Sequence, residues 1–217
     1  MAKNSYAVFG MGAFGTKLAI SLAQSGNTVL ICDRSAARID ELKDKVADAI
    51  IADATSEEVI RELNVSKFDA VILGMSSYFE SQVLALTLLK QAGAKKVIIK
   101  SKSTIQEKIL YRLGADEVIQ PELDVASRLA RRLSLANISD IFEFKGSAIA
   151  DVIVPSALEN IPLRELDLRG KYNITILLKY TPDGLNVCAL GPDTILKAGD
   201  QLTVFGDQKS IIELFQR

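Results

Sequence analysis

A glycine-rich loop near the N-terminus limits the folds open to this chain more than any other feature. The segment VFGMGAFGTKLA, residues 8–19, places Gly10, Gly12 and Gly15 in the spacing GxGxxG. An apolar, strand-like run precedes the loop and a helical pattern follows it, which is the context of a phosphate-binding turn. The first glycine of such a turn bends the chain, the second admits a phosphate close to the backbone, and the third lets helix and strand pack closely. The residues predicted to contact a ligand are Gly10, Met11, Gly12, Ala13, Phe14 and Gly15.

Strand and helix patterns alternate through the first 120 residues. Short apolar runs, typical of strands buried on both faces, lie at Tyr6–Phe9, Thr28–Cys32, Ala49–Ala52, Ala70–Leu73, Lys96–Ile99 and Glu117–Ile119. Helical patterns rich in Leu, Ala, Glu and Lys separate them, at Thr16–Gln24, Ala36–Lys45, Ser56–Leu63, Tyr78–Gln91 and Thr104–Leu113. This alternation predicts an α/β fold, a Rossmann-like doubly wound parallel sheet with helices on both faces.

An acidic residue stands where such a fold binds a ribose. Asp33 ends the second predicted strand, 18 residues after Gly15. A carboxylate there accepts hydrogen bonds from the ribose hydroxyls of a dinucleotide and repels a 2′-phosphate, which disfavours NADP. Arg34 follows it, and either softens that repulsion or flanks the adenine.

Further candidate residues follow the other strands, because ligands of such sheets bind beyond the carboxyl ends of the strands. These residues are Asp53, Ala54 and Thr55, then Gly74, Met75 and Ser76, then Lys100, and finally Glu122. Two of them have an alternative role. Asp53 either contacts the adenine or caps the next helix, and Lys100 either meets a phosphate or a neighbouring carboxylate or is a surface lysine.

The composition weighs against catalysis and against nucleic-acid binding. The chain has 26 basic and 27 acidic residues, so no basic excess points to nucleic acid. Histidine, the commonest general base, is absent. We find no Tyr-x-x-x-Lys pair after the fourth or fifth predicted strand, no nucleophile motif and no metal-ligand cluster in the sequence. The sequence therefore predicts a nucleotide-binding protein that is not an enzyme.

The pattern changes after residue 120. Pro121–Leu135 has the spacing of an amphipathic helix, and predicted strands dominate from Ile141 onward. We place the domain boundary after this helix, with a nucleotide-binding domain at residues 1–135 and a small α+β lobe at 136–217. A lobe of this size buries little surface alone, so we expect it to pair with a second copy.

These motifs resemble the RCK domain, the regulator of potassium conductance. The likeness is carried by VFGMGAFGTKLAISLAQSGNTVLICDRS, by DAVILGMSSYFESQVLALTLLKQAGAKKVIIKSKS and, in the C-terminal lobe, by GPDTILKAGDQLTVFGD. It covers essentially the whole chain. The most similar members are cytosolic regulatory subunits of Ktr/Trk-type bacterial potassium transporters, and a single RCK unit favours the Ktr type.

The resemblance implies a ligand at the glycine loop. RCK domains bind ATP, ADP, NAD or NADH there, with Asp33 on the ribose, Asp53 near the adenine, and Lys100 and Glu122 at the far end. In relatives the glutamate at the position of Glu122 can reach across a dimer toward the terminal phosphate or a monovalent or divalent cation. Relatives that select ATP often carry an arginine where this chain has Ala13, a departure that favours ADP or NAD(H).

The resemblance also implies an assembly. RCK subunits pair through the crossover helix and form rings, commonly homo-octamers, beneath a membrane subunit that conducts potassium. The chain is therefore expected in the cytoplasm, at the inner face of the cell membrane. Some relatives bind cyclic di-AMP between C-terminal lobes, and Arg169 and Lys171 lie in the comparable segment, where they can equally be ordinary surface charges.

Two other functions stay open from the sequence. The first is an NAD-dependent oxidoreductase whose substrate pocket has no sequence signature. The second is an assembly module whose glycine loop binds nothing.

Overall fold

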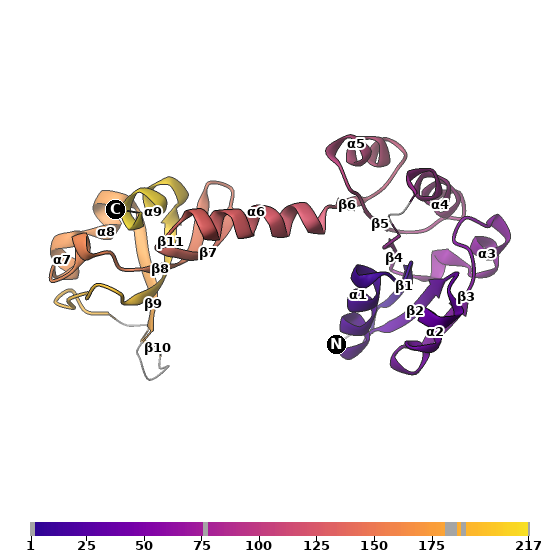
Figure 1. The fold of residues 1–217 in the computed structure, drawn as a ribbon, viewed down its shortest axis with the longest axis horizontal. Coiled ribbons are helices and arrows are strands. Elements are labelled where there is room, and N and C mark those ends of the chain that lie inside the picture. Colours follow the sequence, from indigo (N-terminus) through magenta and orange to yellow (C-terminus); the bar gives the residue numbers. More distant parts are fainter. Residues whose placement is uncertain (1–2, 76–77, 181–185, 188–189, 217) are drawn as a thin grey trace. The chain divides into compact units, whose positions relative to one another are not determined.

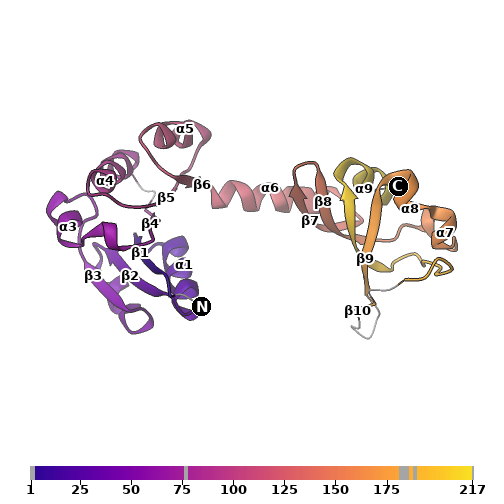
Figure 2. The same ribbon diagram turned by 180° about the vertical axis from the view of Figure 1, so that it is seen from behind.

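The computed structural model describes residues 3–75, 78–180, 186–187 and 190–216. They form two compact units, Met1–Glu122 and Leu123–Arg217, and Figures 1 and 2 show the elements of each from opposite sides. The first helix of the second unit begins at the junction, whereas the sequence-based boundary grouped it with the first domain. The functional boundary at residues 135/136 stays a prediction.

The first unit is built on a parallel sheet of six strands. In chain order they are β1 (Ser5–Phe9), β2 (Thr28–Asp33), β3 (Asp48–Ile51), β4 (Ala70–Leu73), β5 (Val97–Lys100) and β6 (Glu117–Ile119). The spatial order is β3-β2-β1-β4-β5-β6. The chain adds strands on one side of β1 as far as β3 and then on the other side of β1, from β4 to β6. The ligand crevice of a doubly wound fold lies at this change of side, between β1 and β4, outside the carboxyl ends of the strands.

Helices cover both faces of this sheet. The helices are α1 (Ala13–Gln24), α2 (Ala36–Asp40), α3 (Glu57–Glu62), α4 (Phe79–Gln91) and α5 (Thr104–Arg112). Buried side chains of α1 and α2 pack with Val8 on one face, and those of α3, α4 and α5 pack with Ala7 and Phe9 on the other. The predicted second helix was too long, since a separate 3-10 turn at Lys43–Lys45 follows α2.

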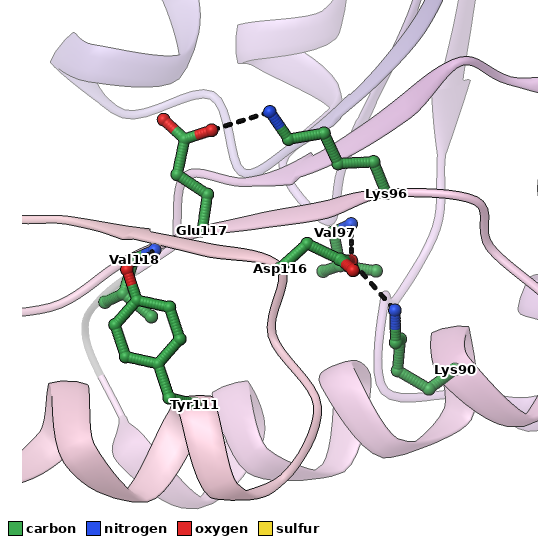
Figure 3. Close-up of polar contacts among 7 residues, drawn as sticks. All are labelled: Lys90, Lys96, Val97, Tyr111, Asp116, Glu117 and Val118. Carbon is green, nitrogen blue, oxygen red and sulfur yellow. Dashed lines mark hydrogen bonds and ion pairs between the residues drawn. The ribbon is translucent and has the colours of Figure 1, made fainter.

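Polar contacts close the edge of the sheet at β6 (Figure 3). Asp116 accepts hydrogen bonds from the Lys90 ammonium at 2.8 Å and from the Val97 amide at 2.7 Å. The Val118 amide donates to the Tyr111 hydroxyl at 3.1 Å. The hydroxyl thus accepts a hydrogen bond from a backbone amide of the edge strand. An unpaired amide on an edge strand is available for pairing with a strand of another chain. The Asp116 contacts lie at the amino ends of β5 and β6. The crevice lies at the other end of the strands, their carboxyl ends.

Helix α6 (Pro121–Ser134) begins two residues before the second unit and continues into it, and this unit contains an antiparallel sheet. Its strands are β7 (Ile138–Phe144), β8 (Ser147–Ile153), β9 (Ile174–Tyr180), β10 (Asn186–Val187) and β11 (Gln201–Asp207), in the spatial order β10-β9-β11-β8-β7. Three helices complete it: α7 (Leu163–Leu166), α8 (Leu168–Tyr172) and α9 (Gln208–Phe215). The predicted Rossmann-like sheet followed by an α+β lobe is confirmed.

Helix α6 keeps an apolar stripe at the surface. It contains no buried residue, and four of its large apolar side chains are exposed by 43 to 76%: Leu123, Val125, Leu129 and Leu133. No helix in the described part of the chain is both long and apolar enough to cross a membrane.

Candidate nucleotide-binding site

The glycine loop connects β1 to α1 with very little free space at two of its glycines. Gly10 has a φ of +93°, and a Cβ atom there would lie 2.7 Å from the Met75 amide nitrogen. A Cβ on Gly15 would lie 2.0 Å from the Gly10 carbonyl oxygen. Only glycine therefore fits at these positions, because helix, loop and the end of β4 touch through their backbones.

Gly12 differs from its neighbours because it faces open space. A Cβ atom there would meet no other atom within 4 Å. Gly12 is also the N-cap of α1, and among the described residues no side chain caps this helix and no acid lies in its first turn. The amides at a helix N-terminus attract an anion, so loop and helix together offer a place for phosphate.

Asp33 joins the end of β2 to the glycine loop. Its Oδ2 atom accepts a hydrogen bond from the Met11 amide at 2.6 Å, and its Oδ1 atom accepts one from the Ser35 amide at 2.8 Å. The Arg38 guanidinium lies 3.5 Å from Oδ2, and only 10% of the Asp33 side chain is exposed. A carboxylate has about four acceptor positions, so these contacts leave capacity for ribose hydroxyls.

Asp53 holds the turn that precedes α3. Its Oδ1 atom accepts hydrogen bonds from the amide and the hydroxyl of Thr55, at 2.9 and 2.7 Å, and these bonds hold the pKa of Asp53 below its ordinary value. Its Oδ2 atom lies 3.6 Å from the Arg34 guanidinium. Asp53 is not the cap of α3, because the N-cap is Ser56, whose hydroxyl accepts from the Val59 amide. Contact of Asp53 with an adenine stays a prediction. Ala54, between these residues, is buried.

Lys100 is a buried lysine at the end of β5. Only 10% of its side chain is exposed, and its ammonium forms an ion pair with Glu122, which is 67% exposed. This hydrogen bond holds the pKa of Glu122 below its ordinary value. The Lys100 nitrogen also lies 5.9 Å from the centre of the Phe14 ring, at the start of α1. Lys100 is therefore not the surface lysine that one alternative supposed.

The strand order separates the two ends of this crevice. Asp33 ends β2 and Lys100 ends β5, with β1 and β4 between them. Three spacings of about 4.8 Å place these strand ends roughly 14 Å apart. The glycine loop, which follows β1, lies between them. A contact of one nucleotide with both Asp33 and Lys100 stays a prediction.

Comparisons with known proteins identify the family of the chain. Residues 6–121 match the TrkA-N domain family, and residues 148–217 match the TrkA-C domain family. The chain belongs to the TrkA-N/TrkA-C family. The RCK resemblance is thereby confirmed.

Two relatives are similar over nearly the whole of both chains. The Ktr system potassium uptake protein C of Bacillus subtilis (strain 168) is 30% identical over 216 residues, with 99% of this chain and 97% of the relative covered. The Ktr system potassium uptake protein A of Vibrio alginolyticus is 31% identical over 210 residues, with 95% and 94% covered. These relatives are potassium uptake proteins and not enzymes, and the prediction of a non-enzymatic chain is confirmed.

A solved structure supports the fold over the same length. The GsuK channel bound to NAD has a TM-score of 0.64 and 14% identity, and the match covers 100% of this chain and 40% of that one. At this identity the likeness shows the fold of the TrkA-N and TrkA-C domains alone.

Sequence reasoning overlooked one residue of the TrkA-N crevice. Gln82 of α4 is 2% exposed, and its side-chain amide donates to the carbonyl oxygens of Met75 and Lys100, at 2.7 and 2.5 Å. The available signal was a polar residue on the apolar stripe of a helix, since Gln82 shares a face with Leu86 and Leu89. Ser76, another predicted contact, lies outside the described residues, and Gly74 donates its amide to the Phe9 carbonyl at 2.8 Å.

A cation site does not follow from the TrkA-N residues of one chain. Glu122 is a single carboxylate, and Lys100 already neutralises it. Within the described ranges, no three acidic, cysteine or histidine side chains gather in a way that could hold a metal ion. Hard cations need several oxygen ligands, so a cation at Glu122 requires oxygens from a bound phosphate or from a second chain.

The TrkA-C domain has a separate cavity of about 310 Å³. Arg164 and Arg169 are among its lining residues, along with the apolar side chains of Leu168 and Ile174. The Lys171 ammonium, also on α8, donates to the Glu165 carbonyl at 3.0 Å. A role of Arg169 and Lys171 in binding cyclic di-AMP stays a prediction.

Proposed function

We propose that this chain is the nucleotide-sensing regulatory subunit of a potassium uptake system. One observation carries the nucleotide part: Asp33, at the ribose position, is hydrogen-bonded to the Met11 amide of a glycine loop that leads into an uncapped helix N-terminus. The potassium part rests on the relatives, both of which are Ktr system potassium uptake proteins.

The ligand we propose is an adenine nucleotide, ATP, ADP, NAD or NADH. Gly12 gives the phosphates room, the first turn of α1 supplies amides and a positive dipole end, and Asp33 accepts from the ribose. Lys100 provides the charge at the far end of the phosphate chain. Ala13, which has no charged side chain, favours ADP or NAD(H) over ATP.

Regulation requires that the ligand distinguish two states of the assembly. A nucleotide that binds both states with equal affinity does not change the ratio of their populations. A tenfold change in that ratio needs a difference of about 1.4 kcal/mol between the two binding free energies. One charge-assisted hydrogen bond between a phosphate and Lys100 is of this size. A phosphate bond that Lys100 makes in only one of the two states would therefore be sufficient to shift the population.

The proposed assembly is a homodimer that associates further into a homo-octameric ring on a membrane potassium-conducting subunit of the Ktr/Trk type. The exposed apolar stripe of α6 supports the dimer, because an amphipathic helix with no buried residue has its apolar side chains available to a second copy. The ring, the membrane partner and the cytoplasmic location at the inner face of the cell membrane rest on the RCK resemblance, and the relatives named as Ktr system potassium uptake proteins support the potassium-transport part.

Calorimetric titration of the purified chain with ATP, ADP, NAD and NADH, with and without magnesium, tests the proposal. Submicromolar to micromolar binding of several competing nucleotides, all recovered unchanged, is the expected result. Binding of NAD and NADH alone, followed by turnover of a carbonyl substrate, supports an oxidoreductase instead. If none of the four nucleotides binds, the result supports the assembly module whose glycine loop binds no ligand.

A further inference from the structure

Gln82 is a fully buried polar residue beside the proposed nucleotide site. It lies in the first turns of α4, on the face that packs against the sheet with Leu86 and Leu89, and only 2% of it is exposed. Both hydrogens of a side-chain amide can donate. Here both have a partner, the Met75 carbonyl at 2.7 Å and the Lys100 carbonyl at 2.5 Å.

The two carbonyls lie where the ladder between β4 and β5 ends. The last paired residues of these strands are Leu73 and Ile99, so Met75 and Lys100 lie beyond the ladder. A buried carbonyl without a donor is unfavourable, and the Gln82 amide supplies donors to both. One side chain thus joins two strand ends whose backbones do not pair with each other there.

Each of these strand ends is part of the crevice. Met75 touches the glycine loop, since its amide nitrogen lies 2.7 Å from where a Cβ on Gly10 would be. Lys100 carries the ammonium group that pairs with Glu122 and lies 5.9 Å from the centre of the Phe14 ring. Gln82 therefore links the support of the glycine loop to the backbone that carries the buried lysine.

We propose that Gln82 is a positioning residue that sets the preference of the site for nucleotides of different phosphate number. By bonding both carbonyls it keeps the Lys100 ammonium at a constant place relative to the glycine loop. This inference rests on the proposed function, because it concerns which adenine nucleotide that same site prefers. An AMP phosphate meets the loop and α1, whereas the later phosphates of ADP and ATP extend toward Lys100.

The test compares Gln82→Met with the wild-type chain by calorimetry of AMP, ADP and ATP. Methionine has a similar length but no donor. We expect ADP and ATP affinities to fall about tenfold and AMP affinity to change less than about threefold, because only the longer ligands use a charge-assisted bond to Lys100. Thr87→Val is the matched control on the same helix, since it removes the 2.8 Å bond to the Val83 carbonyl and touches neither strand end; its affinities should not change.

A double-mutant cycle separates positioning from general damage. In a Lys100→Met background, Gln82→Met should leave the ratio of ADP to AMP affinity unchanged, because the glutamine acts through the lysine. Equal loss of all three affinities, or additive effects in the double mutant, overturns the inference. Should Gln82→Met fail to fold in a thermal unfolding control, Gln82→Leu, which is also apolar and matches Leu86 and Leu89 on the same face, is measured against the same expectation.

The wild-type titration distinguishes the two levels of the argument. A wild-type chain that binds none of the three nucleotides overturns the proposed function and this inference with it. A wild-type chain that binds them, with a ratio that Gln82→Met does not change, overturns only the role of Gln82.

Discussion

The buried ammonium of Lys100 is paired with the exposed carboxylate of Glu122, the second residue of α6. In the proposed binding mode the phosphate path ends at Lys100, so a phosphate that reaches this ammonium would compete with Glu122. The same competition would link the ligand to the first turn of α6.

This competition predicts opposite effects for two substitutions. Lys100→Met should weaken ADP binding about tenfold, because it removes a charge-assisted bond worth about 1.5–3 kcal/mol. Glu122→Gln should strengthen ADP binding by up to about tenfold, since the ligand no longer displaces a carboxylate. Calorimetry without magnesium measures both. Weaker binding in Glu122→Gln would show that the glutamate contributes to the bound state, directly or through a cation.

The glycine loop predicts a contrast between two conservative substitutions. Gly12→Ala should fold with an unchanged melting temperature but bind nucleotides at least about tenfold more weakly, because its methyl group enters only the open space left for phosphate. Gly15→Ala should lower the melting temperature, since its Cβ would lie 2.0 Å from the Gly10 carbonyl oxygen. Thermal unfolding and calorimetry on both variants check this. Unchanged nucleotide affinity in Gly12→Ala would place the phosphates elsewhere.

We expect substitution of Asp33 to lower the affinity for all adenosine ligands by a similar factor. Asp33→Ala should weaken AMP, ADP and NADH by a similar factor, on the order of tenfold to a hundredfold, because it removes a charged acceptor that all of them share. It also removes the acceptor of the Met11 amide, so Asp33→Asn, which keeps one oxygen, should lose less. Competition binding against a fluorescent adenine nucleotide measures the series. Unchanged ADP and NADH affinity in Asp33→Ala would refute the ribose assignment.

The contacts of the Asp116 carboxylate at the edge of the first sheet should depend on pH. Partial burial raises the pKa of this carboxyl, but the Lys90 ammonium and the Val97 amide more than offset it, so the pKa lies below the ordinary value. A lowered folded-state pKa means that the stabilisation is complete above the unfolded value of about 3.9 and is lost as the pH falls through the folded value.

Hydrogen exchange of the Val97 amide reads this contact directly. Asp116→Asn should lower its protection about fivefold at pH 7, which corresponds to about 1 kcal/mol, the usual net worth of such a bond. The difference between variant and wild type should vanish once the pH has fallen below the lowered folded-state pKa of Asp116, because the wild-type carboxyl is then itself protonated. Tyr111→Phe, which affects the neighbouring Val118 amide, is the control. A difference that persisted in acid would contradict a charge-dependent contact.

The apolar stripe of α6 predicts a dependence of assembly on Leu129. Leu129→Glu should shift the purified chain to a monomer at micromolar concentration, because a buried, unpaired carboxylate is unfavourable in an apolar interface. Sedimentation equilibrium measures the mass. Arg128→Gln, on the same helix, is a control that should keep the wild-type mass. A wild-type chain that is already monomeric would contradict the proposed dimer.

The amino-acid sequence determined the architecture of the first unit. Mostly apolar runs of three to five residues separated by helical patterns were sufficient to predict all six parallel strands, because a strand buried on both faces has a simple composition. Gly10 and Gly15 were equally predictable, since their roles depend on backbone geometry that one residue type satisfies.

Only the tertiary structure decided how the side chains of the crevice are engaged. The sequence left Asp53 and Lys100 with two roles each, and it did not single out Gln82 at all. Along the chain, Lys100 lies 18 residues from Gln82 and 22 residues from Glu122, its two partners in these contacts. A local pattern predicts local structure, whereas a long-range contact exists only once the strands have been brought side by side in their order across the sheet.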